Sequence, residues 1–272
     1  VHDPRIKLEI VGEPGPVIVP EPPYWFGAKA RRSPFLLPRE TPARLTIPAN
    51  VEPGVIHWQA ANANGATAVG SFIVGADPEV VEAEASEQTQ QLASLPITVC
   101  GQVKKIEEVD RYRFTAARSG PITCQVATKS IGSELNEVLQ IRDRNDRIIA
   151  STADTTEDDV ALTFAATAGE TYTACVYDLD FSGNRAFVYR LSLREAPRVV
   201  AALPMTAQRG TTQSVEFVGY GLATGESKLE SVTKKVTFPA DPSVTSFTYE
   251  LETPYGIASP LRLFVSDQAV AM

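Results

Sequence analysis

Five acidic side chains between residues 77 and 114 have the chemistry and the spacing of a cation site. They are Glu82, Glu84, Glu87, Glu107 and Asp110. No Lys or Arg lies between Asp77 and Val103 to neutralise the first three. If residues 82–86 are extended, alternate side chains share one face, and a turn at 107–110 can close over them. Because Ca²⁺ prefers carboxylate oxygens, the stretch predicts a divalent-cation site. The alternative is a solvated acidic linker.

A second acidic region lies between residues 148 and 184, which contain seven acids and no bases. Four of the acids lie in the polar run STADTTEDD, and two follow the strand-like run TYTACVY. In order they are Asp154, Glu157, Asp158, Asp159, Asp178 and Asp180. Because polar connections between strands usually lie in solvent, we predict a solvated loop here rather than a second cation site.

Residues that could catalyse a reaction are sparse. The histidines are His2, near the start of the chain, and His57, within the strand-like run VIHWQAA. No Gly-x-Ser-x-Gly elbow accompanies His57, and the sequence lacks zinc-ligand spacing, a phosphate loop and a dinucleotide fingerprint. We therefore expect that the protein is not an enzyme and that His57 lies on a strand surface.

Composition narrows the classes of partner and the compartment. The 272-residue chain has a net charge of −8. Because surfaces that bind nucleic acid or anionic membranes need clustered Lys and Arg, we expect no nucleic-acid partner. No apolar run approaches the roughly 18 to 20 residues that span a bilayer, so we expect no membrane insertion. Abundant Val, Thr and Ser with 20 Pro and 2 Met favour a secreted, periplasmic or cell-surface β protein.

Strand patterns dominate the rest of the chain. Alternating runs such as ITCQVAT, EVLQIRD and FVYRLSL recur between Gly, Pro, Asn and Asp. Residues 79–91 alone have a helix-favouring composition, with poor apolar spacing. We predict an all-β protein of three consecutive β-sandwich domains, with boundaries after GSFIV and YRLSLRE: 1–76, 77–195 and 196–272.

Residues 54–74 and 247–265 form a weak internal repeat. Both read as a strand, a hairpin containing Gly and Ala, and a second strand. We expect a terminal hairpin of shared fold in the two flanking domains.

The three cysteines allow at most one intrachain disulfide, and three pairings are open. Cys124 shares a strand face with Ile122 and Val126 in ITCQV, which favours a buried thiol. Cys175 faces away from the apolar positions of TYTACVY. A bridge between Cys124 and Cys175 is therefore possible but not indicated.

A Pro-rich stretch, residues 14–42, holds a group of aromatic and basic side chains. Tyr24, Trp25 and Phe26 precede a Lys and two Arg, and these three rings are the candidates for an aromatic and cationic ligand-binding surface. Aromatic residues near loops more often belong to the core, so packing of the rings along the edge of a sandwich is the favoured alternative.

The middle of the chain, about residues 79–195, resembles the bacterial pre-peptidase C-terminal domain, a small jelly-roll-like β-sandwich attached to many secreted peptidases. The matching runs, in order, are EVVEAEAS, LPITVCGQV, EEVDRYRFTAARSGPITCQV, GSELNEVLQIRDRNDRIIASTAD, AGETYTACVYD and FVYRLSL. The flanks are similar to immunoglobulin-like domains of large secreted proteins from planctomycete-type bacteria, through NGAT, YGIAS and RGTTQSVEFVGYGL. The resemblance implies an irregular immunoglobulin-like domain, a pre-peptidase-like sandwich and a second immunoglobulin-like domain.

The resemblance also implies a metal. In collagen-binding members of the family, acidic residues and an Asn bind calcium and lock the linker that enters the sandwich. Ser86 stands where those members have the Asn, and it offers a hydroxyl oxygen in place of a carbonyl. With calcium as the expected cofactor, the implied ligands are Glu82, Glu84, Ser86, Glu87, Glu107 and Asp110.

These patterns together predict a non-catalytic fragment of a larger secreted or surface protein, with a role in adhesion, targeting or spacing. The alternative is a calcium-dependent collagen- or polysaccharide-binding module that accompanies a secreted peptidase or hydrolase. The expected partners are an extracellular polymer or other domains of the parent protein.

Overall fold

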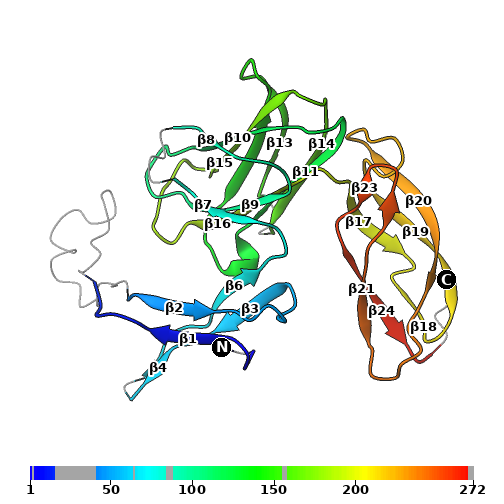
Figure 1. Ribbon diagram of the computed structural model, residues 1–272, viewed down its shortest axis with the longest axis horizontal. Coiled ribbons are helices and arrows are strands. Elements are labelled where there is room, and N and C mark those ends of the chain that lie inside the picture. The colour runs from blue at the N-terminus through cyan, green and yellow to red at the C-terminus, as the bar shows by residue number, and fades with distance from the viewer. Residues whose placement is uncertain (2, 16–40, 64, 84–87, 155–157, 269–272) are drawn as a thin grey trace. The chain divides into compact units, whose positions relative to one another are not determined.

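The computed structural model describes residues 1, 3–15, 41–63, 65–83, 88–154 and 158–268 (Figure 1). The chain divides into two compact units, Val1–Val74 and Gly75–Met272. Apart from the short 3₁₀ helix η2 (Lys129–Ile131), the regular structure given below for the described residues is strand, which confirms the all-β prediction. None of the described helices has the length and apolarity that a bilayer span requires.

The first unit consists of short antiparallel pairs. Its strands are β1 (Lys7–Ile10) with β2 (Ala43–Thr46), β3 (Gly54–Trp58) with β6 (Gly70–Val74), and β4 (Ala61–Asn62) with β5 (Gly65–Ala66). His57 is exposed on β3, as predicted, and its Nδ1 lies 2.9 Å from Oγ of Ser71, the residue opposite on β6. Among the described residues of this unit, the buried apolar side chains are Ile6 and Val51.

The second unit begins with a β-sandwich of two five-stranded sheets (Figure 1). One sheet has the order β13-β12-β15-β10-β8 and the other the order β14-β11-β16-β9-β7. The strands are β7 (Glu79–Val81), β8 (Gln90–Gln91), β9 (Ile97–Gln102), β10 (Asp110–Thr115), β11 (Gly120–Ala127), β12 (Glu137–Arg142), β13 (Ile148–Ala153), β14 (Val160–Ala166), β15 (Thr171–Asp178) and β16 (Val188–Arg194). The β7–β9 and β8–β10 pairs are parallel, and the other pairs are antiparallel.

Period-2 alternation places the side chains of this central sandwich. Along β10, Tyr112 and Phe114 are buried in the core between the sheets, and Arg111 and Arg113 face outward. The same core holds Cys124, as predicted, whereas Cys175 lies on β15 between core-facing positions and points the other way. All three cysteines are free thiols, so no disulfide forms.

The described residues of 79–91 are not helical, although the composition of this stretch favours a helix. They include β7 and β8, which add edge strands to the two sheets. Parallel pairing with β9 and β10 satisfies backbone groups there, and this tertiary gain outweighs a weak intrinsic helix propensity.

The remaining strands of the second unit form two three-stranded sheets around a separate apolar core. Their orders are β17-β19-β20 and β18-β24-β21. The bounds are β17 (Arg198–Leu203), β18 (Thr206–Gln208), β19 (Thr212–Tyr220), β20 (Leu229–Thr237), β21 (Ser246–Tyr249) and β24 (Leu261–Ser266). Phe217, Leu222, Phe238 and Leu263 are among the buried side chains of this core.

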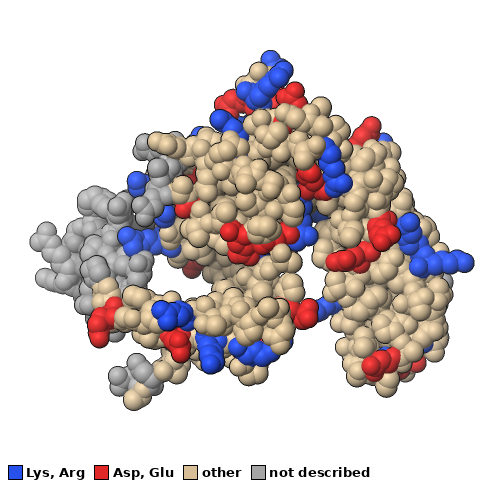
Figure 2. Space-filling model, viewed as in Figure 1, with Lys and Arg blue, Asp and Glu red and all other residues tan. Residues whose placement is uncertain are grey.

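The internal repeat is present as a common order of strands. The antiparallel pair β21–β24 encloses a small hairpin, β22 (Glu252–Thr253) with β23 (Gly256–Ile257), as the pair β3–β6 encloses β4–β5. Figure 2 shows acidic and basic side chains scattered over the visible face, without one continuous patch of either sign.

Truncation of a core side chain tests the central sandwich. We expect Leu139→Ala on β12 to lower the free energy of unfolding by about 2–5 kcal/mol, because Leu139 is fully buried and its loss leaves a cavity. Native-state hydrogen exchange of the β12 and β15 amides in the whole chain measures the change. Val81→Ala is the control, because Val81 is 76% exposed on the edge strand β7. It should change stability by less than about 0.5 kcal/mol, and equal effects of the two substitutions would contradict the core assignment.

Candidate functional site

Three carboxylates from separate segments of the central sandwich meet at one point. Glu82 follows β7, Glu108 lies in the turn before β10, and Asp110 is the first residue of β10. One oxygen of each lies within 4.8 Å of the others. Asp110 is 2% exposed and Glu108 is 8% exposed, and the side chain of Glu82 is 6% exposed. We call these three residues the acid cluster.

Each carboxylate of the acid cluster is held through one oxygen. The backbone N–H of Gln102 donates to Oε2 of Glu82 at 2.7 Å. The N–H groups of Lys104 and Lys105 both donate to Oε2 of Glu108, the latter at 2.7 Å. The hydroxyl of Tyr189 donates to Oδ2 of Asp110 at 2.6 Å. These bonds fix the orientation of all three groups before any ligand arrives.

The second oxygen of each carboxylate is buried and has no hydrogen-bond partner. These atoms are Oε1 of Glu82, Oε1 of Glu108 and Oδ1 of Asp110. Such groups are costly, because desolvation is not offset by a bond. The nearest cation identified is Nζ of Lys104, 3.6 Å from Oε1 of Glu82, on a side chain that is 41% exposed. Three neighbouring carboxylates, each with a buried oxygen that accepts no hydrogen bond, are a donor set for a hard cation.

Burial and like charge act together on the protonation of the acid cluster. Burial raises the pKa of Asp110 to about 7, and the nearby carboxylates of Glu82 and Glu108 add to the shift, while the Tyr189 hydrogen bond opposes it. Burial also raises the pKa of Glu82. Without a cation, the site therefore retains a proton near neutral pH that a cation would displace.

The structure brings together only part of the predicted metal set. Glu82 and Asp110 meet as expected, but Glu107 is exposed with φ of 62°, and its N–H donates to the carbonyl of Phe181. The structure places its neighbour Glu108, and not Glu107, in the acid cluster. The alternation of β10 could have pointed to Glu108 from the sequence, because side chains two residues apart share a face and positions 108, 110 and 112 are all buried.

The remaining predicted site residues cannot be placed. Glu84, Ser86 and Glu87 lie outside the described residues, as do the aromatic candidates Tyr24, Trp25 and Phe26. A small pocket borders two members of the acid cluster, and Gln88 and Gln90 line it together with Glu82 and Asp110. The pocket gives a small ion access to these two carboxylates.

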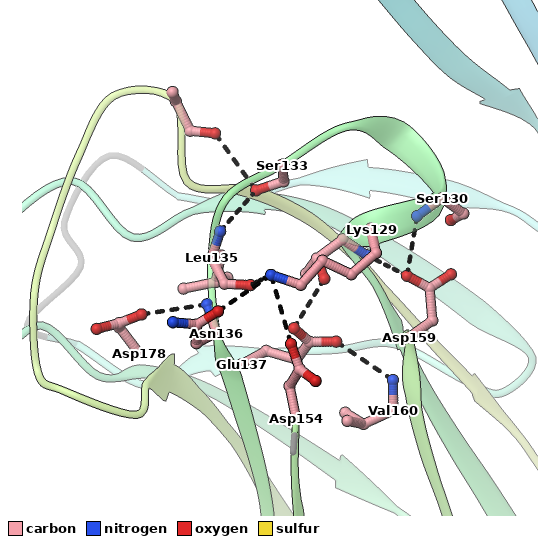
Figure 3. Close-up of polar contacts among 12 residues, drawn as sticks. Lys129, Ser130, Ser133, Leu135, Asn136, Glu137, Asp154, Asp159, Val160 and Asp178 are labelled. Carbon is pink, nitrogen blue, oxygen red and sulfur yellow. Dashed lines mark hydrogen bonds and ion pairs between the residues drawn. The ribbon is translucent and has the colours of Figure 1, made fainter. Parts of the chain in front are cut away.

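Two acids of the second acidic region are buried, in contrast to the solvated loop that the sequence favoured, whereas Asp158 and Asp180 are exposed. Asp154 is 6% exposed and Asp178 is 2% exposed. The ammonium of Lys129 lies 3.4 Å from Oδ2 of Asp154 and donates to the carbonyl of Leu135 at 2.9 Å and to Oδ1 of Asn136 at 3.1 Å (Figure 3). The Lys129 ammonium thus lies among the oxygens of this site, in the position that a bound cation would take.

Two further acids at this place in the sandwich, Glu137 and Asp159, also accept hydrogen bonds from the protein. Glu137, which the sequence did not single out, is fully buried and accepts from Thr128 Oγ1 at 2.7 Å and from the N–H of Val160 at 3.2 Å (Figure 3). Asp159 Oδ1 accepts from the N–H groups of Thr128 and Ser130 at the start of η2. The region is therefore a structural network, in contrast to the acid cluster with its unpartnered oxygens.

The fold and the site together define an all-β protein whose central sandwich carries a buried carboxylate cluster. No protein-family model matches the chain, and no curated protein matches it. Among solved structures, it is similar to the pre-peptidase C-terminal domain of collagenase from Bacillus anthracis. The sequence identity is 19% over 39% of this chain and 95% of that one, with a TM-score of 0.33.

Two further solved structures are similar to the chain. One is Aeromonas hydrophila PliG, a periplasmic inhibitor of g-type lysozyme, with 14% identity over 44% of this chain and 98% of that one and a TM-score of 0.31. The other is tripeptidyl peptidase 2, with 10% identity over 66% of this chain and 16% of that one and a TM-score of 0.26. We base no functional assignment on these similarities.

The raised pKa of Asp110 predicts a pH dependence of stability in chelator. Between pH 4 and about 7 the folded state binds more protons at this group than the unfolded state, so stability falls as the pH rises through that window. The loss should amount to a few kcal/mol, at about 1.4 kcal/mol per pKa unit. We expect Asp110→Asn to flatten this part of the curve of unfolding free energy against pH. A parallel curve for the variant would contradict the prediction.

Removal of the Lys129 ammonium tests the structural network. We expect Lys129→Met to lower the free energy of unfolding by about 3–5 kcal/mol, because buried Asp154 loses its counter-ion. Asp154→Asn in the same chain should restore part of the loss. Lys228→Met is the control, because this exposed lysine pairs with exposed Glu226 and should matter by less than about 1 kcal/mol. Urea denaturation of all three variants measures the differences, and a neutral Lys129→Met would refute the assignment.

Proposed function

We propose that the acid cluster binds Ca²⁺ and that the chain is a calcium-stabilised, non-catalytic module of a larger extracytoplasmic protein. The observation that carries the proposal is the set of three buried, unpartnered oxygens from Glu82, Glu108 and Asp110. A single proton neutralises only one of the three neighbouring carboxylates. A divalent ion with flexible, oxygen-rich coordination fits the charge and the donor type.

Other groups can complete the coordination shell. Ca²⁺ takes roughly six to eight oxygens, and the acid cluster supplies three of them, or more where a carboxylate binds through both atoms. Glu84, Ser86 and Glu87 follow Glu82 closely in sequence and remain our candidates for further ligands, together with water. Lys104 can leave Glu82 when the ion binds, because its side chain is largely exposed.

The position of Glu82 suggests what the metal does. Residues 77–82 lead into the sandwich, and two arginines of β16 already hold them: Arg194 Nε lies 2.6 Å from Asp77 Oδ2, and Arg190 pairs with Glu79. Ca²⁺ would join Glu82 to the start of β10 and to the turn at 104–108. The result is a linker fixed to its domain, as a spacer or a presenting module in a multidomain protein requires.

The wider assignment follows from the sequence patterns together with this site. We propose three sandwich domains, 1–76, 77–195 and 196–272, the outer two immunoglobulin-like, in a secreted, periplasmic or surface protein. Adhesion, targeting or spacing fits such an arrangement. The second candidate, a collagen- or polysaccharide-binding module that accompanies a secreted peptidase or hydrolase, depends on a surface that recognises a polymer.

Titration with Ca²⁺ tests the proposal. Binding to the native state alone raises stability by RT ln(1 + [L]/Kd), which is about 2.7 kcal/mol at a hundred times the Kd. We therefore expect millimolar Ca²⁺ to raise the melting temperature of the whole chain and calorimetry to show one site.

Glu108→Gln and Glu107→Gln form a matched pair for this titration. The first removes a charged ligand and should weaken Ca²⁺ binding at least about tenfold. The second makes the same Glu-to-Gln change at the exposed neighbour Glu107, and its Kd for Ca²⁺ should stay within about threefold of the wild-type value. Equal Ca²⁺ affinities of the two variants would refute the calcium site. So would a wild-type melting temperature that does not change when Ca²⁺ is added.

A further inference from the structure

The outer face of the sheet β13-β12-β15-β10-β8 carries a row of guanidinium groups. Arg111 and Arg113 are exposed on β10, two residues apart, and so lie about 7 Å from each other along the strand. The strand register sets Arg113 opposite Thr173 of β15, and Thr173 opposite Arg142 of β12. Arginines therefore lie on β10 and β12, on either side of Thr173 of the intervening strand β15.

These guanidinium groups are incompletely neutralised. Arg111 donates to the carbonyl of Val109, and among the described residues neither Arg111 nor Arg113 forms an ion pair with a carboxylate. Arg142 pairs with Asp146 at 3.0 Å, but that aspartate side chain is 79% exposed and can be exchanged for a ligand. A local excess of positive charge in a chain of net charge −8 marks this face as a site for an anionic partner.

Polar and aromatic groups extend the same face. Arg142 Nη2 donates to Oε1 of Gln140 at 3.1 Å, and Gln140 Nε2 donates to the hydroxyl of Tyr177 at 2.8 Å. Tyr177 stacks on Phe181, with ring centroids 5.2 Å apart, and Phe181 is 48% exposed. This chain of contacts orders the side chains in advance, which lowers the entropic cost of binding.

We propose that this face binds a carboxylated polysaccharide. Guanidinium groups bind carboxylates through paired hydrogen bonds, and Arg111 and Arg113 lie on one face, where they can contact two acidic groups of the same polymer chain. The Tyr177–Phe181 pair adds aromatic surface against which a sugar ring packs. An acidic peptide would use the charges but would not need the aromatic pair. The proposal goes beyond calcium binding and does not depend on it, because Arg111 and Arg113 face away from the acid cluster.

Binding of oligogalacturonate to the whole chain tests this inference. The titration is done by calorimetry in EDTA at about 50 mM salt, where charge interactions are only partly screened. EDTA also removes calcium that the sugar itself would hold. We expect saturable binding of oligogalacturonate and none of neutral galactose oligomers of the same length. Glu108→Gln should bind oligogalacturonate as the wild type does, which separates this result from the calcium test.

Matched variants assign the binding to the face. Arg111→Gln/Arg113→Gln should weaken binding at least tenfold, whereas Lys234→Gln/Lys235→Gln removes the same charge from exposed positions of β20 and should leave the Kd within twofold. Phe181→Ala should weaken oligogalacturonate binding at least threefold and leave the binding of poly-L-glutamate unchanged.

Three outcomes would overturn the proposal. The first is no binding of oligogalacturonate by the wild type. The second is equal weakening by the arginine and lysine pairs, which would mean charge attraction without a site. The third is binding of poly-L-glutamate as tight as that of oligogalacturonate, which would assign the face to an acidic peptide. Circular dichroism spectra and melting curves show that each variant is folded before its affinity is compared.

Discussion

Closure of two five-stranded sheets over one apolar core determines where the charged groups of the central sandwich can lie. Period-2 alternation sends every second side chain of a strand into that core. At the ends of the strands the alternation continues into polar residues, and it buries Glu108 and Asp110 beside Tyr112 and Tyr189. Carboxylates in such a position must be bonded, protonated or bound to a cation.

The sandwich resolves this constraint in two different ways. Around Asp154 and Glu137 the chain supplies its own partners: the Lys129 ammonium, the Thr128 hydroxyl and backbone N–H groups (Figure 3). In the acid cluster each carboxylate has one bonded and one unpartnered oxygen. Similar acids thus serve as a structural network at one place and as a ligand set at the other. The difference lies in the lysines: Lys129 is largely buried and also donates two hydrogen bonds within the network, whereas Lys104 is more exposed and pairs with Glu82 alone in the acid cluster.

The two proposed sites use opposite faces of the same strand. Asp110 points inward at the start of β10, while Arg111 and Arg113 point outward. A cation that joins Glu82 to β10 would fix the segment that leads into the sandwich, and the outward arginines would remain open to a polymer. A module of this kind combines a defined attachment to its neighbours with a rigid binding face.

The sequence by itself determined the strands, the all-β fold, the buried Cys124 and the acidic stretch that contains the cluster, because these follow from local alternation and composition. It did not determine which acids meet. Glu108 replaced Glu107 because strand phase, set by pairing of β10 with β15, decides which of two adjacent residues is buried. Lys129 reached Asp154 for a similar reason: residues 25 positions apart approach only when two sheets close. Long-range pairing therefore decided the site, and local pattern decided the elements that carry it.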